Sequence, residues 1–545
     1  MKKLICIVLA LLLLAGCGAA PDVTEGTTQP KGDGKLRATV AGSEVVFEAW
    51  EQEGMPTEGS WYLTRDVELT QSVVITGQLK LHLNGHAVTG AKDTNFGQMF
   101  DVAAGGELVL CDEAEGAGAI ISPRSFSAMP YVKHVIRVAG TVTMAGGTVD
   151  ATAISLENVA NGAAFSVEDG GVLNIEGGTV VGGTTLCYSL DPTKNIPIDS
   201  EPADTPTEPV EGATEPVATE PAPTEPATTE PVTTETTEPV EMPELFGKGG
   251  AVYVAVGGTL NLSGGTIQGG SAGLGGSVYL EEDAGKPGTM NMSGGLVTSG
   301  ETIFHGGNIY IAGLMNMSGG EIAEGQAYNH GGNLVVTGTL EMTGGVIRGG
   351  QCGAGGLSGK RGGNILVNGL NATVSIADAQ ILGGKATSGE GFGGNISVIG
   401  QCAREFSVVN TLIADGMGHR GGNLYFGTLA KDVSPDNLDF YMKDVTVRDG
   451  TSSYRGANLC MDSDLRGVYV NLVMDNSTFL LEDKSRGTIS LGAGAAIDTW
   501  ATLTMNGGAI EGGDLMLYVD SVLTANGTKM WRIEEIDDGR LVINP

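Results

Sequence analysis

The chain has few aromatic residues and few basic ones. Phe, Trp and Tyr make up 5% of its 545 residues, and 30 Lys and Arg stand against 64 Asp and Glu, which gives a net charge of -34. Nucleic acids and anionic membrane surfaces are bound by basic patches. We therefore expect no nucleic-acid partner for the body of the protein.

The cysteine pattern does not match a disulfide framework or a zinc site. Two of the seven cysteines lie in the first 17 residues, and the other five are widely spaced: Cys111, Cys187, Cys352, Cys402 and Cys460. Such isolated thiols are expected to fill small buried positions. We expect no metal and no other cofactor.

The longest apolar run falls within residues 1–20, MKKLICIVLALLLLAGCGAA. Two lysines, a short apolar stretch and small residues are typical of a secretory signal. The segment Leu14-Ala15-Gly16-Cys17 resembles the lipobox of bacterial lipoproteins, which implies cleavage before Cys17 and lipidation of its thiol; the alternative is an ordinary cleaved signal. We expect a signal at 1–16, a polar tether at 17–35, and an exported chain anchored in the membrane through Cys17 and exposed at the cell surface.

Glycine is abundant, with 88 residues, and it marks an internal repeat. The six-residue motif GGNIYI at Gly306 recurs as GGAVYV, GGSVYL, GGNLVV, GGNILV, GGNISV, GGNLYF and the weaker GANLCM. Counted on its third residue, the copies lie at 251, 277, 308, 333, 364, 395, 423 and 458, between 25 residues (308 to 333) and 35 residues (423 to 458) apart. A second motif, such as GTLNLSGGTI at Gly258, lies between the copies.

Each motif alternates polar and apolar residues over four to six positions, which predicts a short strand, and its Gly or Asn residues suit sharp corners. Short strands at this period predict an all-β parallel β-helix, or solenoid, of about thirteen coils. The pattern resembles the right-handed, pectin-lyase-like β-helix of bacterial surface proteins, a family that holds enzymes, adhesins and inert stalks. We expect the following residues inside: Leu260, Leu262, Ile267, Ile309, Ile311, Met315, Met317 and Ile322.

One segment interrupts the repeat. Residues 191–244 consist almost wholly of Thr, Glu, Pro, Ala and Val, which predicts a disordered insertion grown from one corner of a coil. The expected organisation is therefore an N-terminal cap at 36–60, β-helix at 61–190 and 245–530, and a C-terminal cap at 531–545. The expected body is a monomer.

Two groups of residues are candidates for function. The slot before each Gly pair holds a basic or titratable residue in six of eight copies: Lys248, His305, His330, Arg361, Arg420 and Arg455. Two residues after the third position of the motif lie Tyr253, Tyr279, Tyr310 and Tyr425, which alternation places outward. Tyr rings stack on sugars and cations pair with carboxylate or sulfate, so these columns suit an anionic glycan. The structural alternative is strand preference for Tyr and offset of acidic neighbours.

Catalytic signatures are weak. The segment Gly416 to Arg420, with Asp415 before it and Asp449 one coil on, is the closest match to the ionisable clusters of polysaccharide-cleaving β-helices, and we assign no catalytic residue. A metal between His305 and His330 lacks a third ligand. The expected function is a non-catalytic surface for adhesion or glycan binding, with a glycan or a host or cell-surface protein as partner. The alternatives are a lyase or hydrolase acting on a uronic-acid glycan, and a purely structural spacer.

Overall fold

The structure is a computed structural model, in which every element of the described residues is a strand. It describes the following residues: 34–40, 42–91, 97–112, 118–123, 133–154, 161–185, 247–283, 285–353, 359–369, 372–387, 389–399, 405–428, 438–463, 469–482, 487–491, 500–518, 520–531, 535–536 and 539–545. The signal, Cys17, the tether up to residue 33 and the insertion at 191–244 lie outside the described residues.

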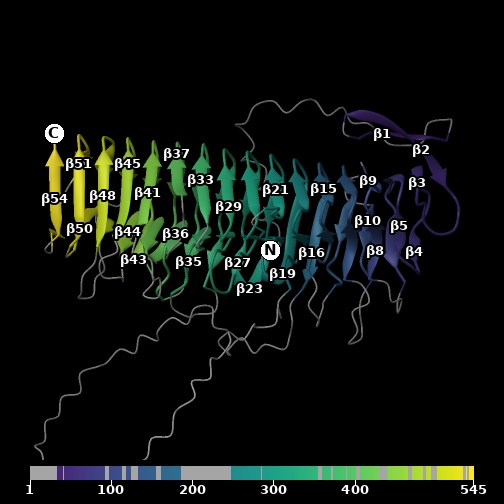
Figure 1. The fold of residues 1–545 in the computed structure, drawn as a ribbon, viewed down its shortest axis with the longest axis horizontal. Helices are drawn as coiled ribbons and strands as arrows, with labels where there is room; N and C mark the ends of the chain where they lie inside the picture. The colour runs from purple at the N-terminus through teal and green to yellow at the C-terminus, as the bar shows by residue number, and fades with distance from the viewer. Residues whose placement is uncertain are drawn as a thin grey trace, which may run out of the picture.

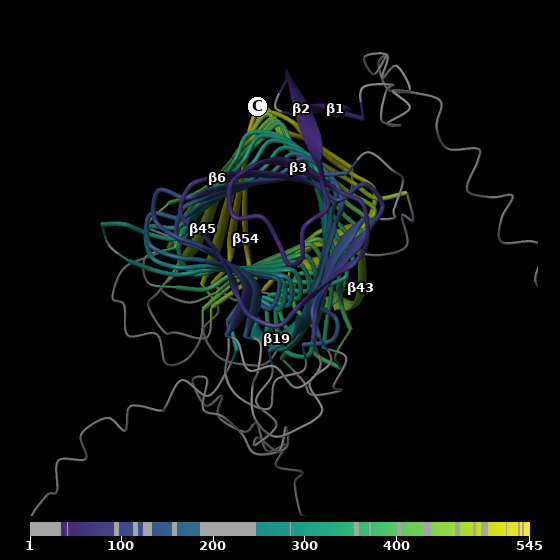
Figure 2. The same ribbon diagram turned by 90° about the vertical axis from the view of Figure 1, so that its right-hand side faces the viewer.

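The strands stack into a parallel β-helix with three long sheets, as predicted (Figures 1 and 2). One coil runs through β21 (Thr289–Met292), then β22 (Leu296–Thr298) and β23 (Glu301–His305), then β24 (Ile309–Ile311). The next coil begins at β25 (Leu314–Met317), which pairs in register with β21. We name the sheets after this path: sheet 1 contains β21, sheet 2 contains β22 and β23, and sheet 3 contains β24. Sheet 3 has 15 strands.

Alternation along each strand builds one continuous apolar core from Leu63 to Leu523. The eight residues predicted to point inside are all 0–1% exposed. Burying such side chains stabilises a fold by roughly 1.5–3 kcal/mol each. Cys111, Cys352 and Cys460 are free buried thiols, as expected.

Glycine permits the corner before the sheet 3 strands that follow a Gly pair, for two separate reasons. The first Gly of the pair adopts a positive φ, for example 72° at Gly306. The second is crowded at Gly307, because a Cβ there would lie 2.1 Å from the carbonyl oxygen of Gly332 in the next coil. A side chain at Gly306 or Gly307 would therefore be strained.

A hairpin lies against the outer side of sheet 1 near one end of the molecule (Figure 2). Strand β1 (Leu36–Val40) pairs antiparallel with β2 (Ser43–Trp50), whose end then pairs parallel with β3 (Gly59–Leu63). Phe47 and its neighbours on the hairpin pack against Tyr62 and Val109 on the outer side of sheet 1, and Figure 2 shows the hairpin outside the ring of coils. At the other end, β53 (Glu535–Ile536) and β54 (Arg540–Asn544) extend sheets 3 and 1 in register.

The insertion falls within one coil, between β16 (Thr179–Thr184) and β17 (Val252–Val254). Strand β16 pairs with β19 (Thr266–Leu274) of the next coil, from Thr179 and Thr266 to Thr184 and Ser271. Strand β17 pairs in register with β20 (Val278–Leu280) of that same coil. The ladders on both sides of the insertion therefore continue in register.

Candidate functional site

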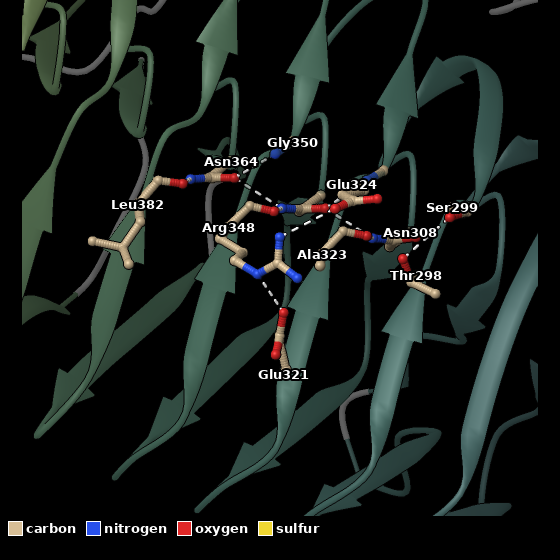
Figure 3. A network of polar contacts seen from close by, with 12 residues as sticks. Thr298, Ser299, Asn308, Glu321, Ala323, Glu324, Arg348, Gly350, Asn364 and Leu382 are labelled. Atoms are coloured by element: carbon tan, nitrogen blue, oxygen red, sulfur yellow. Dashed lines mark hydrogen bonds and ion pairs between the residues drawn. The ribbon is translucent and has the colours of Figure 1, made fainter. Parts of the chain in front are cut away.

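A buried column of asparagines fixes the corner beside the predicted site residues. The column contains Asn308, Asn333, Asn364, Asn395, Asn423 and Asn458, all 0% exposed. Each of the first five donates from Nδ2 to Oδ1 of the next at 2.7–2.8 Å. Asn308 also donates to the carbonyl of Ala323 and accepts from the backbone N–H of Gly300, and the others repeat this pattern (Figure 3). The six side chains therefore form a continuous hydrogen-bonded ladder.

The residues that directly precede the Gly pairs form a second continuous column. Parallel bridges or strand pairs join Lys248 to Leu274, His305 to His330 and Arg420 to Arg455, with Phe392 between Arg361 and Arg420. The register that the sequence predicts is therefore present. His305, Arg361 and Phe392 are each 7% exposed, and the other members are partly exposed, so the column is buried only in part.

The two histidines stack face to face, with His305 buried and His330 partly buried. Their ring centroids lie 5.1 Å apart with planes inclined by 5°. Burial lowers the pKa of His305 to about 3, and burial together with the charge of His305 lowers the pKa of His330 well below its usual value. The lone pairs of parallel rings lie in parallel planes and do not converge on one ion. The arrangement suits packing of neutral imidazoles.

The later basic residues are engaged with aromatic rings. The Arg361 guanidinium lies 4.7 Å from the ring centroid of Phe392, and Arg455 lies 4.7 Å from Tyr454 and 4.1 Å from Tyr518. Arg420 pairs at 3.0 Å with Asp462, which is 1% exposed. Since these cations already have partners, an incoming carboxylate would compete with them.

The tyrosine column lies on the outer side of sheet 3, as alternation predicts. Tyr253, Tyr279 and Tyr310 stack on each other, with centroids 6.1 and 5.3 Å apart. Glu281 accepts hydrogen bonds from Tyr253 at 2.8 Å and from Lys248 at 3.0 Å. Stacked rings cover each other's faces, and a sugar ring needs an open face.

The outer side of sheet 3 carries its own apolar cluster. Tyr425, Val335, Leu366, Phe392 and Cys460 are at most 7% exposed there. Sequence alternation gives the direction of a side chain but not whether that side of the sheet is covered. Glycan binding along the two columns stays a prediction, and the burial of Tyr279, His305, Arg361 and Tyr425 limits what a ligand reaches.

The aspartates considered for catalysis serve as corner residues. Asp415 and Asp449 adopt positive φ values of 60° and 53°. Asp449 accepts from the Arg448 guanidinium at 2.7 Å and from the backbone N–H of Glu482 at 3.2 Å. Neither aspartate lines the groove into which His419 opens.

That groove has a volume of about 670 Å³ and lies over the ends of β35 (Lys385–Ala386), β39 (Met417–Arg420) and β43 (Thr451–Arg455). Met417 and Tyr454 are 45% and 48% exposed there. His419 stacks on Tyr454 with centroids 5.0 Å apart, and its Nδ1 lies 2.9 Å from Oγ of Ser453. Partial burial and the charge of Arg420 lower the pKa of His419.

The groove brings together one residue already singled out, His419, and several that sequence reasoning missed. A signal did exist, because the slot before the basic column holds Phe304, His419 and Tyr454 among mostly small or polar residues. Its side chains combine thioether, ring edge, imidazole and hydroxyl groups: Met417, Met516, Tyr454, His419, Thr387 and Ser453. The described lining includes no carboxylate.

Comparison with known proteins does not assign the chain to a family. No family model, curated protein or solved structure matches the chain. The described residues hold no group of three or more His, Cys, Asp or Glu placed to bind a metal ion. They also include no helix long and apolar enough to cross a membrane.

Proposed function

We propose that the protein is an exported lipoprotein, anchored through lipidated Cys17, that binds glycans without cleaving them. The observation that carries the proposal is the groove around His419 and Tyr454. Its volume of about 670 Å³ falls in the usual range for ligand sites. Exposed Met417 offers apolar contact to a sugar, while Ser453, Thr387 and the Tyr454 hydroxyl offer hydrogen bonds.

The position of the groove supports this role. The hairpin β1–β2 lies at one end of the stack, and the groove lies toward the other (Figure 1). A tether attached before Leu36 would hold the hairpin end nearest the membrane. The rigid stack would then present the groove outward, as in surface-exposed members of the right-handed, pectin-lyase-like group that the repeats resemble.

The test is binding to a panel of neutral and uronic-acid glycans, with the Cys17→Ser chain used to avoid the lipid. Tyr454→Ala and Ser453→Ala should each weaken binding by roughly tenfold, about 1.4 kcal/mol. Tyr469→Ala is the matched control, because Tyr469 is an exposed tyrosine outside the groove (37% exposed). Unchanged binding in both groove variants would reject the groove as the site.

One observation favours the alternative of a uronate lyase. A lyase needs a base, and His419 has a lowered pKa and opens into the groove. The same panel should therefore be scored for unsaturated sugar products by ultraviolet absorbance. Product formed by the parent chain and lost in His419→Ala would overturn the non-catalytic proposal.

The predicted column along sheet 3 is tested separately. Combined Tyr310→Ala and Arg361→Ala changes leave the groove residues in place. If this double variant lost glycan binding while Tyr454→Ala bound glycans normally, the binding site would be assigned to the column and not to the groove.

A further inference from the structure

A stretch of sheet 1 presents an uncharged outer face. It spans β12 (Thr141–Met144), β15 (Val172–Ile175), β18 (Thr259–Leu262), β21 and β25, each with two outward positions. No outward position of these five strands is charged, although the chain carries a net charge of -34. Carboxylates resume on both sides, with Glu107 opposite Thr141 and Glu341 opposite Asn316.

One outward position is asparagine in four successive strands: Asn174, Asn261, Asn291 and Asn316. Each of the last three donates from Nδ2 to Oδ1 of the preceding one, at 2.8, 2.9 and 2.9 Å. All four are partly exposed, unlike the buried column beside sheet 3. A carboxamide has two N–H donors and two acceptor lone pairs, and the column uses one of each at Asn261 and Asn291.

The remaining donor and acceptor of each central amide are therefore held in a fixed orientation, facing outward. They recur at the strand spacing of about 4.8 Å. The neighbouring outward position adds hydroxyl and methyl groups from Thr141, Thr259 and Thr289. Side chains that are already ordered lose little entropy on binding, which favours a ligand with a matching repeat.

We propose that this face binds extended neutral glycan chains that carry hydroxyl or acetamido groups. The surrounding acidic surface disfavours anionic ligands, and the face itself offers no carboxylate to a cation. A neutral polymer with alternating donors and acceptors matches the outward amides, and its C–H groups match the threonine methyls. The inference goes beyond the groove, from which these residues are separate.

The experiment measures retention of the Cys17→Ser chain on cellulose and chitin particles, with immobilised polygalacturonate as the anionic comparison. We expect retention on at least one neutral polymer and little on polygalacturonate. Thr259→Ala with Thr289→Ala should weaken retention roughly tenfold, about 1.4 kcal/mol. Asn261→Asp with Asn291→Asp, which places like charges in the column, should do the same.

A control variant and a shared background substitution separate binding at this face from binding elsewhere on the molecule. Thr502→Ala with Thr504→Ala changes the same kind of outward threonines on β48 (Ala501–Asn506), and should leave retention unchanged. Every chain compared in this experiment also carries Tyr454→Ala, which removes the contribution of the groove, so the outcome does not depend on the groove proposal. Melting curves identify variants that fail to fold. The inference would be overturned by equal retention on polygalacturonate or by no retention on either neutral polymer. It would also be overturned if ultracentrifugation showed that the chain self-associates through this face.

Discussion

Asn308 donates from Nδ2 to Oδ1 of Asn333 across 2.8 Å, and both side chains are 0% exposed. The link joins neighbouring coils at a corner, outside the strands themselves. Each amide also bonds the backbone on both sides of the corner, as Asn333 does with Gly325 and Arg348. The column therefore aligns the coils at the corner that leads into sheet 3.

Removing one member of the buried column should be costly. Asn364→Ala leaves the N–H groups of Asn333 and Gly350 without their acceptor in the interior. Unsatisfied buried groups cost about 1–3 kcal/mol each, so we expect a loss of about 3 kcal/mol in the free energy of unfolding. Asn506→Ala, in an exposed row between Asp475 and Asn526, should cost no more than about 1 kcal/mol. Denaturant titrations showing equal losses would contradict the role assigned to burial.

The second glycine of each pair should reject even a methyl group. A Cβ on Gly307 would meet the Gly332 carbonyl oxygen at 2.1 Å and the Gln326 nitrogen at 2.4 Å. We expect Gly307→Ala to lose more than about 4 kcal/mol or to fail to fold. The control is Gly389→Ala, since nothing lies within 4 Å of that Cβ position. Soluble yield and unfolding free energy measure both, and a stable Gly307→Ala protein would refute the crowding argument.

Acid should destabilise the fold through the stacked histidines. Burial holds the pKa of His305 at about 3 and lowers that of His330, whereas an unfolded histidine has a pKa of about 6.5. The unfolded chain therefore binds more protons as pH falls below about 6.5, and stability is lost toward about pH 3. His305 contributes a slope of about 1.4 kcal/mol per pH unit in this window, and His330 adds to the slope below about pH 6.5.

His330→Gln should remove one such contribution, because glutamine can still accept the N–H of Arg361 but does not titrate. The measurement compares unfolding free energy at several pH values between 7 and 4, as rough bounds of the window. His305→Gln should reduce the slope similarly. Parallel profiles for both variants and the parent chain would show that these rings titrate as they do in the unfolded state.

Replacing either of two ion-paired arginines with alanine should lower the stability of the fold, by very different amounts. Arg420→Ala removes the ion-pair partner of Asp462, which is 1% exposed. Among the described side chains, Asp462 then keeps only the hydroxyl of Tyr425 as a donor. Breaking a buried pair costs about 3–5 kcal/mol. Arg348→Ala removes contacts to Glu321 and Glu324 at the surface and should cost at most about 1 kcal/mol. Thermal and denaturant unfolding of both variants provide the comparison.

The repeats carried enough information to predict the coils and their register. Gly306, Gly307 and Asn308 recur together, and because every copy must close the same corner, aligning the copies aligns the coils. The inward direction of Ile309 and Ile311 followed from strand alternation. These predictions rest on local backbone geometry, which the sequence encodes directly.

Burial on the outer side of sheet 3 was not predictable in the same way. Tyr279 and Leu366 point away from the core, yet they are 4% and 1% exposed. Alternation is a property of one strand, whereas cover depends on segments distant in the sequence. The groove was missed because Ser453 and Tyr454 lie before the shared motif. The segment there varies in length from one repeat to the next, so aligning the repeats does not align these residues.

The corner between β16 and β17 has a consequence for protein engineering. The 61 residues 186–246 (246 − 186 + 1) separate these two strands of one coil in the sequence, and both strands still pair in register with the next coil. Closing a longer loop costs only about 0.6 kcal/mol for each doubling of its length. We expect this corner to accept an inserted foreign domain whose termini lie close together. The β-helix would then serve as a rigid scaffold that displays the domain at a fixed position.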